Sequence, residues 1–325
     1  MAQSPGEARE STMMTLRIGT RGSQLALWQA HWVAEELLTS FPYLDVQVVV
    51  IRTSGDESSG ETGGQTEDSA HTPLNSSQQD LDSVGLFTSE IERALLDGKI
   101  DLAVHSLKDL PCELGAGLEI GAYCRREDSR DVLISKNELS LDELPAGSQI
   151  GTSSLRRRAQ ILAFRPDLRC VELRGNLDTR LRKLDESPDL SGIVVAAAGM
   201  IRLGWQSRIS QYLDRDRFLP APAQGVIAVE ISTERSDVKD LMVGLNHKPT
   251  ELEARTERSF LQALQAGCHT PVGAHAVHVN DSLELSGMVF SLDGYRHVEV
   301  KAKGTDPELT GQQAAKDALR AGEVI

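Results

Sequence analysis

The same short pattern occurs twice in this chain, and it limits the possible folds more than any other feature of the sequence. Ile18-Gly-Thr-Arg-Gly-Ser23 and Ile150-Gly-Thr-Ser-Ser-Leu155 each lead from an apolar strand through Gly-Thr into a serine-bearing turn and then a helix. In the first helix, Trp28 and Trp32 lie at helical spacing and are expected in the core, and Ser23 is expected to be the N-cap. Helix N-termini bind anions through free backbone N–H groups. The repeat therefore predicts two α/β domains that point helix N-termini at a shared cleft.

A polar group of residues follows the short apolar run 100–104, which has the pattern of a strand buried inside a sheet. Four of the five residues in 105–109 are polar (His, Ser, Lys and Asp), and Pro111 favours an extended residue before it, so the polar stretch is not expected to continue as a helix. Ligands of α/β proteins bind at the carboxyl ends of strands, which makes this a candidate catalytic position. An ordinary surface ion pair between Lys108 and Asp109 is the alternative, and spacing alone slightly favours it.

Length and charge exclude several classes of protein. The chain of 325 residues is long enough for two or three domains, and its net charge of −14 argues against a general nucleic-acid binder. No apolar run is long enough for a transmembrane helix, and residues 1–15 lack the apolar core of a signal peptide. We therefore expect a cytoplasmic protein that binds neither membranes nor nucleic acid.

The four cysteines are scattered and form no C-x-x-C pair, which favours reduced thiols over a disulfide framework or a metal site; they are Cys112, Cys124, Cys170 and Cys268. Cys268 lies between Gly267 and His269, just past an expected helix C-terminus, where the helix dipole disfavours a thiolate. Spacing alone therefore favours a buried structural thiol over a conventional nucleophile.

The composition changes between residues 53 and 83, where Gly, Ser, Thr, Gln, Asp and Glu dominate. No Lys or Arg occurs between Arg52 and Arg93. A polar stretch of this length buries too little apolar surface to fold by itself, so we expect a mobile loop, of the kind that forms lids or disordered insertions. A helix over about 86–96 is expected to follow it.

The rest of the chain continues the α/β pattern and then changes. The apolar run 226–231 is expected to return the chain to the first domain. Thr250-Glu-Leu-Glu253 has the form of a capping box and predicts a helix that Gly267 ends. The last part alternates by twos and closes with a helix near 307–320, which predicts a small α+β domain.

Basic residues outnumber acidic ones by nine to three between Thr152 and Lys183, although the whole chain is acidic. Arginine forks bind carboxylates and phosphates bidentately. A solvated helix face accounts for some of these side chains, namely Arg158, Arg165, Arg169 and Arg182. Better candidates for binding an anion are the arginines beside turns, which are Arg21, Arg156, Arg157 and Arg174. Together they predict a polyanionic ligand.

Eight separated stretches, in order, resemble the porphobilinogen deaminase (hydroxymethylbilane synthase) family. The N-terminal four are RIGTRGSQLALWQAH (17–31), DLAVHSLKDLP (101–111), REDSRDVLIS (126–135) and GTSSLRRRAQ (151–160). The others are ELRGNLDTRL (172–181), AAAGMIRLG (196–204), LPAPAQG (219–225) and GCHTPVGA (267–274). The resemblance covers nearly the whole chain.

The resemblance implies a reaction and a cofactor. The family condenses four porphobilinogen molecules head to tail with loss of ammonia, and then releases hydroxymethylbilane by hydrolysis, a step of tetrapyrrole (haem or chlorophyll) biosynthesis. It primes the chain with a dipyrromethane cofactor held by a thioether, and Cys268 matches that cysteine. A reactive electrophile there would remove the need for a thiolate. Asp109 matches the catalytic aspartate, which serves proton transfer and stabilises positive charge on pyrrole nitrogens.

The resemblance also implies which residues bind the carboxylates of the cofactor and of the growing polypyrrole chain. Cofactor contacts are implied, besides Cys268, for Ser106, Lys108, Thr152, Ser154, Arg156, Arg157, Arg174, Gly175 and Asn176. Substrate contacts are implied for Arg21, Ser23, Gln29, Phe87, Arg180, Arg202 and Gln224. The family uses no metal and suggests a monomer.

One segment departs from the family pattern, which has lysines before and after Gly-Leu-Phe in a loop over the cleft. Here Val84 and Ser89 stand at those positions, Phe87 is retained, and the preceding loop is acidic. Like charges repel in a narrow cleft, so this loop is expected to meet an anionic product chain poorly.

The expected architecture is α/β with three domains, two of which resemble the type II periplasmic-binding-protein fold. Residues 14–124 with 226–243 would form the first, including Asp109 and loop 53–83. Residues 130–219 would form the second, arginine-rich domain, and residues 248–325 an α+β domain with the cofactor cysteine. The alternative from another class is a non-catalytic, two-lobed anion-binding or effector-sensing protein, which would give Cys268 no role.

Overall fold

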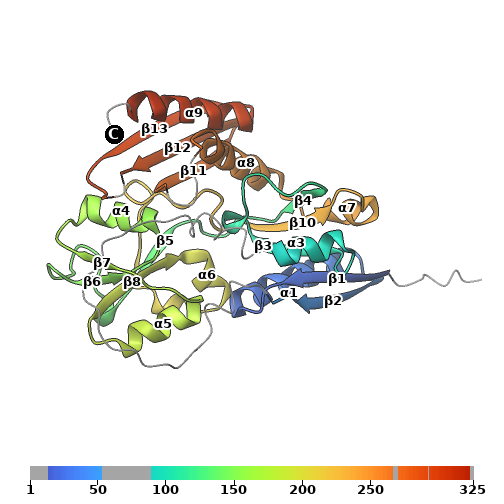
Figure 1. The fold of residues 1–325 in the computed structure, drawn as a ribbon, viewed down its shortest axis with the longest axis horizontal. Helices are drawn as coiled ribbons and strands as arrows, with labels where there is room; N and C mark the ends of the chain where they lie inside the picture. Colours follow the sequence, from blue (N-terminus) through green and yellow to red (C-terminus); the bar gives the residue numbers. More distant parts are fainter. Residues whose placement is uncertain (1–13, 53–88, 266–269, 292, 323–325) are drawn as a thin grey trace, which may run out of the picture.

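The computed structural model describes residues 14–52, 89–265, 270–291 and 293–322, and within them the chain forms three β-sheets with packed helices. Figure 1 shows the first two sheets in the lower half of the molecule and the third above them. The N-terminal segment, loop 53–83, Phe87 and Cys268 lie outside the described residues.

The first lobe is a five-stranded sheet in the order β2-β1-β3-β10-β4. Strand β1 runs parallel to β2 and β3, and β10 runs antiparallel to β3 and β4. Its strands are β1 (Met14–Thr20), β2 (Leu44–Val50), β3 (Leu102–Ser106), β4 (Leu118–Tyr123) and β10 (Ile227–Ser232), with helices α1 (Gln24–Ser40), α3 (Ser89–Leu96) and α7 (Ser236–Met242). The predicted return of the chain to this sheet through β10 is confirmed.

The second lobe repeats this arrangement in a sheet of order β7-β6-β8-β5-β9. Strand β6 is parallel to β7 and β8, and β5 is antiparallel to β8 and β9. Its elements are β5 (Asp131–Ser135), β6 (Gln149–Gly151), β7 (Arg169–Val171), β8 (Leu190–Ala196), β9 (Gln211–Tyr212), α4 (Leu155–Phe164), α5 (Leu177–Glu186) and α6 (Ala197–Arg202). The two repeated sequences thus form β1 and β6, at equivalent positions in two mixed sheets, and the expected three-part α/β fold is confirmed.

The third unit is an antiparallel sheet, β11-β12-β13, with two helices against it. Its elements are α8 (Lys248–Ala263), β11 (Val272–Val279), β12 (Ser282–Phe290), β13 (His297–Gly304) and α9 (Pro307–Gly322). Figure 1 shows α8 and α9 along the sheet. Phe260 of α8 is fully buried between them, beside Val272 and Leu285. The alternating sequence therefore makes the predicted small α+β unit.

Both helices that follow the repeated pattern are capped as serine at an N-cap predicts. The hydroxyl of Ser23 accepts a hydrogen bond from the Ala26 N–H, and that of Ser154 accepts one from the Arg157 N–H. Trp28 and Trp32 pack partly buried against the core of the first lobe. The N-termini of α1 and α4 are therefore fixed by local sequence.

Two local predictions need correction. Helix α8 begins at Lys248, and its N-cap is His247, whose ring accepts a hydrogen bond from the Thr250 N–H, so Thr250 is not the cap. The helix extends upstream because Pro249 fits its first turn, where no N–H is needed. It ends at Ala263, before Gly267.

Short 3-10 turns occupy Leu107–Asp109, Lys136–Glu138 and Gln206–Arg208. The polar stretch after β3 was not expected to be helical, but it forms one 3-10 turn before Leu110 becomes extended.

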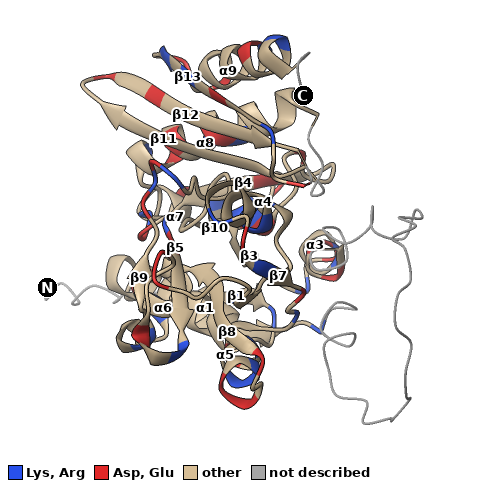
Figure 2. Ribbon diagram, turned by 90° about the vertical axis from the view of Figure 1, so that its left-hand side faces the viewer, with Lys and Arg blue, Asp and Glu red and all other residues tan. Residues whose placement is uncertain are grey.

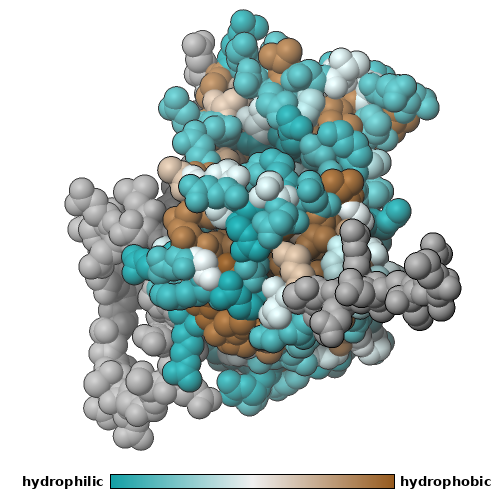
Figure 3. All heavy atoms as spheres, turned by 90° about the vertical axis from the view of Figure 1, so that its right-hand side faces the viewer, coloured by the Kyte–Doolittle hydropathy of each residue, from teal (hydrophilic) through white to brown (hydrophobic). Residues whose placement is uncertain are grey.

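The surface carries no single large apolar patch on the face that Figure 3 shows, where brown areas are separated by hydrophilic side chains. Val243, Tyr295 and Leu309 are each more than half exposed, and they belong to different elements. Among the described residues, no helix has both the length and the apolar character that crossing a membrane requires.

Candidate active-site cleft

The turn after β3 separates apolar from polar side chains. Leu107 and Leu110 are buried in a small core with Ala223, while Lys108 is half-buried and Asp109 is exposed. The backbone N–H of Leu107 donates to the carbonyl of Val226 at 3.0 Å, which attaches the turn to the beginning of β10. The fold therefore presents Lys108 and Asp109 at the carboxyl end of a central strand, as the sequence predicts.

Lys108 and Asp109 do not form the simple surface ion pair. The Nζ of Lys108 donates to Oε1 of Gln224 at 3.2 Å, and burial lowers the pKa of Lys108 to about 8, although the nearby Asp109 opposes that shift. Among the residues that the structure describes, the Asp109 carboxylate has no hydrogen-bond or ion-pair partner. Its charge is therefore available to a ligand.

The second lobe faces this turn with a buried charge cluster centred on Asp131 at the start of β5. Asp131 Oδ2 lies 2.7 Å from Arg156 Nη1, and Oδ1 lies 2.8 Å from Arg157 Nη2. Burial opposes ionisation of Asp131, but the two guanidinium groups hold its pKa well below its usual range. Figure 2 shows the basic residues on α4, from which both arginines come. One carboxylate thus compensates only one of two buried cations.

Gln224 links the two lobes. Its Nε2 donates to Asp131 Oδ1 at 2.9 Å and to the carbonyl of Ser129 at 2.8 Å, while its Oε1 accepts from Lys108 and from Arg157 Nη2 at 3.5 Å. The Gln224 side chain is fully buried. Its hydrogen bonds therefore fix the positions of the Lys108 and Arg157 side chains.

Two further predicted arginines have a lowered pKa. Burial and the nearby Arg157 lower the pKa of Arg180 to about 10, with Asp109 acting in the opposite direction, and its Nε donates to the carbonyl of Gly175 at 2.8 Å. Burial likewise lowers the pKa of Arg202 to about 10; its guanidinium donates to the carbonyl of Gly225 and lies 6.0 Å from the Trp28 ring. Neither side chain has an acidic hydrogen-bond partner among the described residues.

The charges of the cleft do not balance without a ligand. Four cations and two carboxylates interact electrostatically here. The cations are Lys108, Arg156, Arg157 and Arg180, and the carboxylates are Asp109 and Asp131. A buried cation without a counter-charge is unfavourable. The residues present therefore fit an anionic group with several carboxylates, such as a dipyrromethane with acidic side chains.

The remaining predicted site residues are placed as follows. Gln29 Nε2 donates to Ser106 Oγ at 3.0 Å, which joins α1 to β3 beside the turn. The hydroxyl of Thr152 accepts from the N–H of Ser154 at 3.2 Å, at the start of α4. Gly175 and Asn176 precede α5, where Gly175 has a φ of 121° that favours glycine.

Arg21 and Arg174 are placed differently from each other. Arg21 is half-buried at the turn before α1. Arg174 is mostly exposed, with 79% of its side chain accessible, and its Nε lies 2.5 Å from Glu172 Oε1. Arg174 is thus the predicted basic residue least enclosed by the cleft.

Sequence reasoning missed two carboxylates, Asp131 and Glu257. Glu257, on α8, is fully buried and accepts from the guanidinium of Arg126 at 2.6 and 3.1 Å. It also accepts from the backbone N–H groups of Ala223 at 2.6 Å and Ala276 at 2.7 Å. Glu257 thereby attaches the third unit to the segment that carries Gln224. In the sequence each of them is a single acid beside an arginine, Asp131 after Arg130 and Glu257 before Arg258, which is only a weak signal.

The fold and the site define a class: a two-lobed α/β protein in which cations of both lobes gather beside an exposed carboxylate. A family model described as "Porphobilinogen deaminase, dipyromethane cofactor binding domain" matches residues 16–240, and one described as "Porphobilinogen deaminase, C-terminal domain" matches residues 251–320. The chain belongs to the porphobilinogen deaminase family.

Curated relatives agree over almost the full length. The chain is 49% identical over 303 residues to a porphobilinogen deaminase of Desulfitobacterium hafniense, covering 93% of each chain. It is 45% identical over 312 residues to one of Syntrophomonas wolfei, covering 95% of this chain and 97% of the relative. The predicted family is confirmed.

Two solved structures of binding proteins resemble the chain distantly. The periplasmic aliphatic sulphonate binding protein SsuA from Escherichia coli has a TM-score of 0.39 at 11% identity, covering 79% of this chain and 72% of its own. A nutrient binding protein from Burkholderia cenocepacia bound to methionine has a TM-score of 0.40 at 12% identity, covering 70% and 90%. At these values the fold assignment depends on the strand orders of the two lobes.

Proposed function

We infer that this chain is a hydroxymethylbilane synthase, which joins four porphobilinogen molecules head to tail with release of ammonia and then releases the linear product by hydrolysis. The observation that carries this inference is that Asp109, an exposed carboxylate without a hydrogen-bond or ion-pair partner among the described residues, lies near an excess of buried and half-buried cations from both lobes. Family membership supports it independently. The enzyme is thus a transferase of porphyrin synthesis.

The cofactor of the family is dipyrromethane, and the cleft suits it. We propose that Lys108, Arg156 and Arg157 face its carboxylates, with contacts also from Ser106, Thr152, Ser154, Arg174, Gly175 and Asn176. When bound, it supplies the primer ring to which the first substrate is joined. Cys268, outside the described residues, is the proposed attachment point.

Substrate binding is assigned to a second set of cations from the two lobes. Porphobilinogen carries two carboxylates, which suit guanidinium forks. We propose that Arg21, Arg180 and Arg202 bind them, helped by Ser23, Gln29, Gln224 and Phe87. Because Gln224 is fully buried, its part is to orient Lys108 and Arg157.

Asp109 is the proposed catalytic residue. Loss of ammonia from porphobilinogen leaves a cation, and attack by a pyrrole ring then places positive charge on a second ring nitrogen. A fixed carboxylate near both nitrogens stabilises these states more than the neutral ground state. The exposed, unpartnered position of Asp109 among the described residues supports this role.

The proposed division of the chain follows the three sheets. Residues 14–124 with 226–243 form the domain of Asp109, residues 130–219 the arginine-rich domain, and residues 248–325 the domain of Cys268. We further propose that the enzyme is a cytoplasmic monomer whose only partners are porphobilinogen and its polypyrrole chain.

The intact mass of the purified protein tests this function against a non-catalytic anion-binding protein. Native protein should carry the additional mass of two linked pyrrole rings and should release one ammonia for each porphobilinogen consumed. A protein of unmodified mass that binds porphobilinogen without releasing ammonia would support the binding protein instead.

A further inference from the structure

A residue of the third unit, Arg258, donates hydrogen bonds to the backbone of the turn that carries Lys108 and Asp109. On α8, Arg258 Nη1 donates to the carbonyl oxygens of Leu107 at 3.4 Å and Leu110 at 3.2 Å, and Nη2 donates to that of Pro111 at 2.6 Å. One guanidinium thus binds three carbonyls within five residues of sequence. No other described side chain bridges this turn to the third unit in this way.

The turn needs such a donor because of its own sequence. Two of its N–H groups already have backbone partners: that of Leu107 donates to the carbonyl of Val226 in the first lobe, and that of Leu110 donates to the carbonyl of Leu107 within the turn. Pro111 has no N–H, so the segment cannot continue as a helix that would use its carbonyls. Carbonyls next to buried leucines lose water and require partners, and hydrogen bonds from a cation are the stronger kind. Arg258 supplies them.

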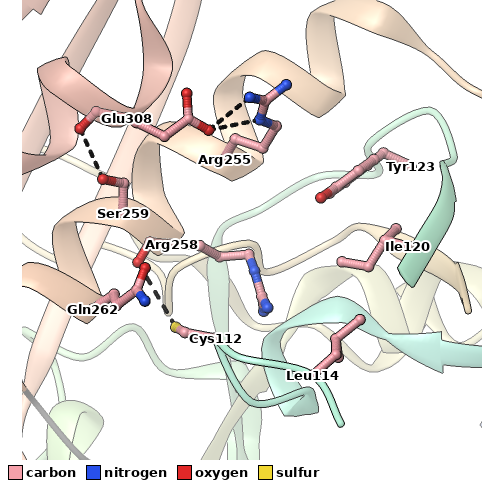
Figure 4. Close-up of a pocket in the computed structure, with 9 residues that line it drawn as sticks. All are labelled: Cys112, Leu114, Ile120, Tyr123, Arg255, Arg258, Ser259, Gln262 and Glu308. Carbon is pink, nitrogen blue, oxygen red and sulfur yellow. Dashed lines mark hydrogen bonds and ion pairs between the residues drawn. The ribbon is translucent and has the colours of Figure 1, made fainter. Parts of the chain in front are cut away.

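Arg258 acts away from the cleft. Its side chain is about nine-tenths buried, and it lines a pocket of about 280 Å³ between the first lobe and the third unit. Figure 4 shows its side chain reaching from α8 toward Leu114 and Ile120, and shows Cys112, whose thiol donates to the Arg258 carbonyl. The side chains that meet the ligand, Lys108 and Asp109, belong to the opposite side of the turn.

Arg255, one turn earlier on the same helix, provides an internal comparison. It lines the same pocket, but its guanidinium pairs with Glu308 at 2.7 Å, as Figure 4 shows. It also pairs with Glu251 at 3.0 Å. Neither acid belongs to the turn after β3. Arg255 and Arg258 therefore share helix, pocket and charge, and differ in whether they bind the turn.

We propose that Arg258 is a positioning residue that fixes the Asp109 carboxylate at the working distance from substrate. The proposal rests on the proposed catalytic role of Asp109. Because a misplacement of about 1 Å at a catalytic group costs on the order of 100-fold in rate, loss of these bonds should lower kcat strongly and leave substrate affinity nearly unchanged. The pocket beside Arg258 also gives a free guanidinium ion access to the vacated position.

The test compares Arg258→Ala, Arg258→Lys and Arg255→Ala with the parent, after intact mass has shown equal cofactor content. We expect kcat to fall on the order of 100-fold in Arg258→Ala with KM within about threefold, and to fall less in Arg258→Lys, which keeps the charge but not the fork. Arg255→Ala should keep its kcat. Added guanidinium chloride at low millimolar concentration should raise kcat in Arg258→Ala and in no other protein of the set.

Hydrogen exchange gives a readout independent of activity. The Leu110 amide should exchange faster in Arg258→Ala than in Arg255→Ala or the parent, and guanidinium should restore its protection. Parent-like kcat in Arg258→Ala, or in Arg258→Lys if the alanine variant does not fold, would overturn the proposal, as would unchanged Leu110 exchange. If the parent itself consumed no porphobilinogen, the proposed function would fail, while the exchange result would still report on the turn.

Discussion

Two carboxylates of the cleft have opposite surroundings and therefore different uses. Asp131 is fully buried and accepts hydrogen bonds from Arg156, Arg157 and Gln224, so its charge is already compensated. Asp109 is exposed and accepts no hydrogen bond from any described side chain or backbone group. When two acids differ in surroundings in this way, the buried one can hold cationic side chains in position and the exposed one can contact substrate.

Replacing Asp109 by asparagine tests the second use. Asparagine keeps the shape but removes the charge, so kcat should fall by about 100-fold to 1000-fold, while the variant folds and keeps its cofactor. Asp109→Glu, with the charge displaced by one methylene, should retain part of the activity. Steady-state consumption of porphobilinogen measures both.

Glu113→Gln is a matched control, because Glu113 is an exposed acid on the same segment that contacts only Gln262 among the described residues. It should leave kcat unchanged. Asp109→Asn turning over within a few-fold of the parent would mean that Asp109 is not catalytic.

Lys108 predicts a pH dependence of binding. Burial lowers the pKa of Lys108 to about 8, so its charge is present below pH 8 and is lost as the pH rises through that value. If protonated Lys108, besides facing the cofactor, also binds a carboxylate of the incoming porphobilinogen, KM should rise roughly tenfold between pH 7 and pH 9. Lys108→Arg stays charged over this range, so its KM should rise less. Equal pH profiles for the two proteins would contradict the assignment.

Among the helices and strands, the sequence predicts well those features that depend only on the residues nearby in the chain. The strands that precede the two repeated turns, the cap Ser23 and the return of the chain through β10 follow from periodicity and turn chemistry. The sequence misplaces the start of α8. A proline before a capping-box pattern suggests that the helix starts after it, whereas Pro249 occupies the first turn of the helix.

The site was only partly predictable for a different reason. Asp109 and Lys108 stand out because they follow a buried strand. Asp131 and Gln224 do not, since their importance comes from contacts between residues far apart in the chain, such as Lys108 with Gln224. Residue type and spacing carry no information about such partners.

Gln224→Ala should weaken the link between the lobes. It removes buried hydrogen bonds to Asp131, Lys108 and the Ser129 carbonyl, so the free energy of unfolding should fall by about 1–3 kcal/mol and kcat should fall as well. Gln211→Ala is the control, because Gln211 accepts from the Leu141 N–H within the second lobe alone. Urea unfolding with kinetics on both variants measures the difference; a stability loss without any loss of kcat in Gln224→Ala would reduce Gln224 to a structural role.

For the whole molecule, the excess of cations in the cleft predicts that the cofactor stabilises the fold. The chain is acidic overall, with a net charge of −14, yet it buries Arg156, Arg157, Arg202 and Arg258. An anionic group bound only by the folded state raises stability, and a covalent one cannot dissociate. The holoprotein is therefore the form in which the three parts are held together most firmly.

Cys268→Ala should have the unmodified mass, no activity and a lower Tm than the holoprotein. Added sulfate should raise its Tm more than that of the holoprotein, because the cations then lack their covalent partner. Cys170→Ala is the control: burial raises the pKa of Cys170 to about 11, and its replacement should leave mass and activity intact. A cofactor adduct on Cys268→Ala would place the attachment elsewhere.

The most direct measurement of the central claim is the mass of the protein during turnover. Holoenzyme mixed with porphobilinogen and quenched in acid should show species heavier by one, two, three and four pyrrole units, each formed with loss of ammonia. Asp109→Asn should accumulate these species far more slowly from the same starting mass. Consumption of porphobilinogen by the native protein with no covalent pyrrole species at any time would contradict stepwise assembly on this chain.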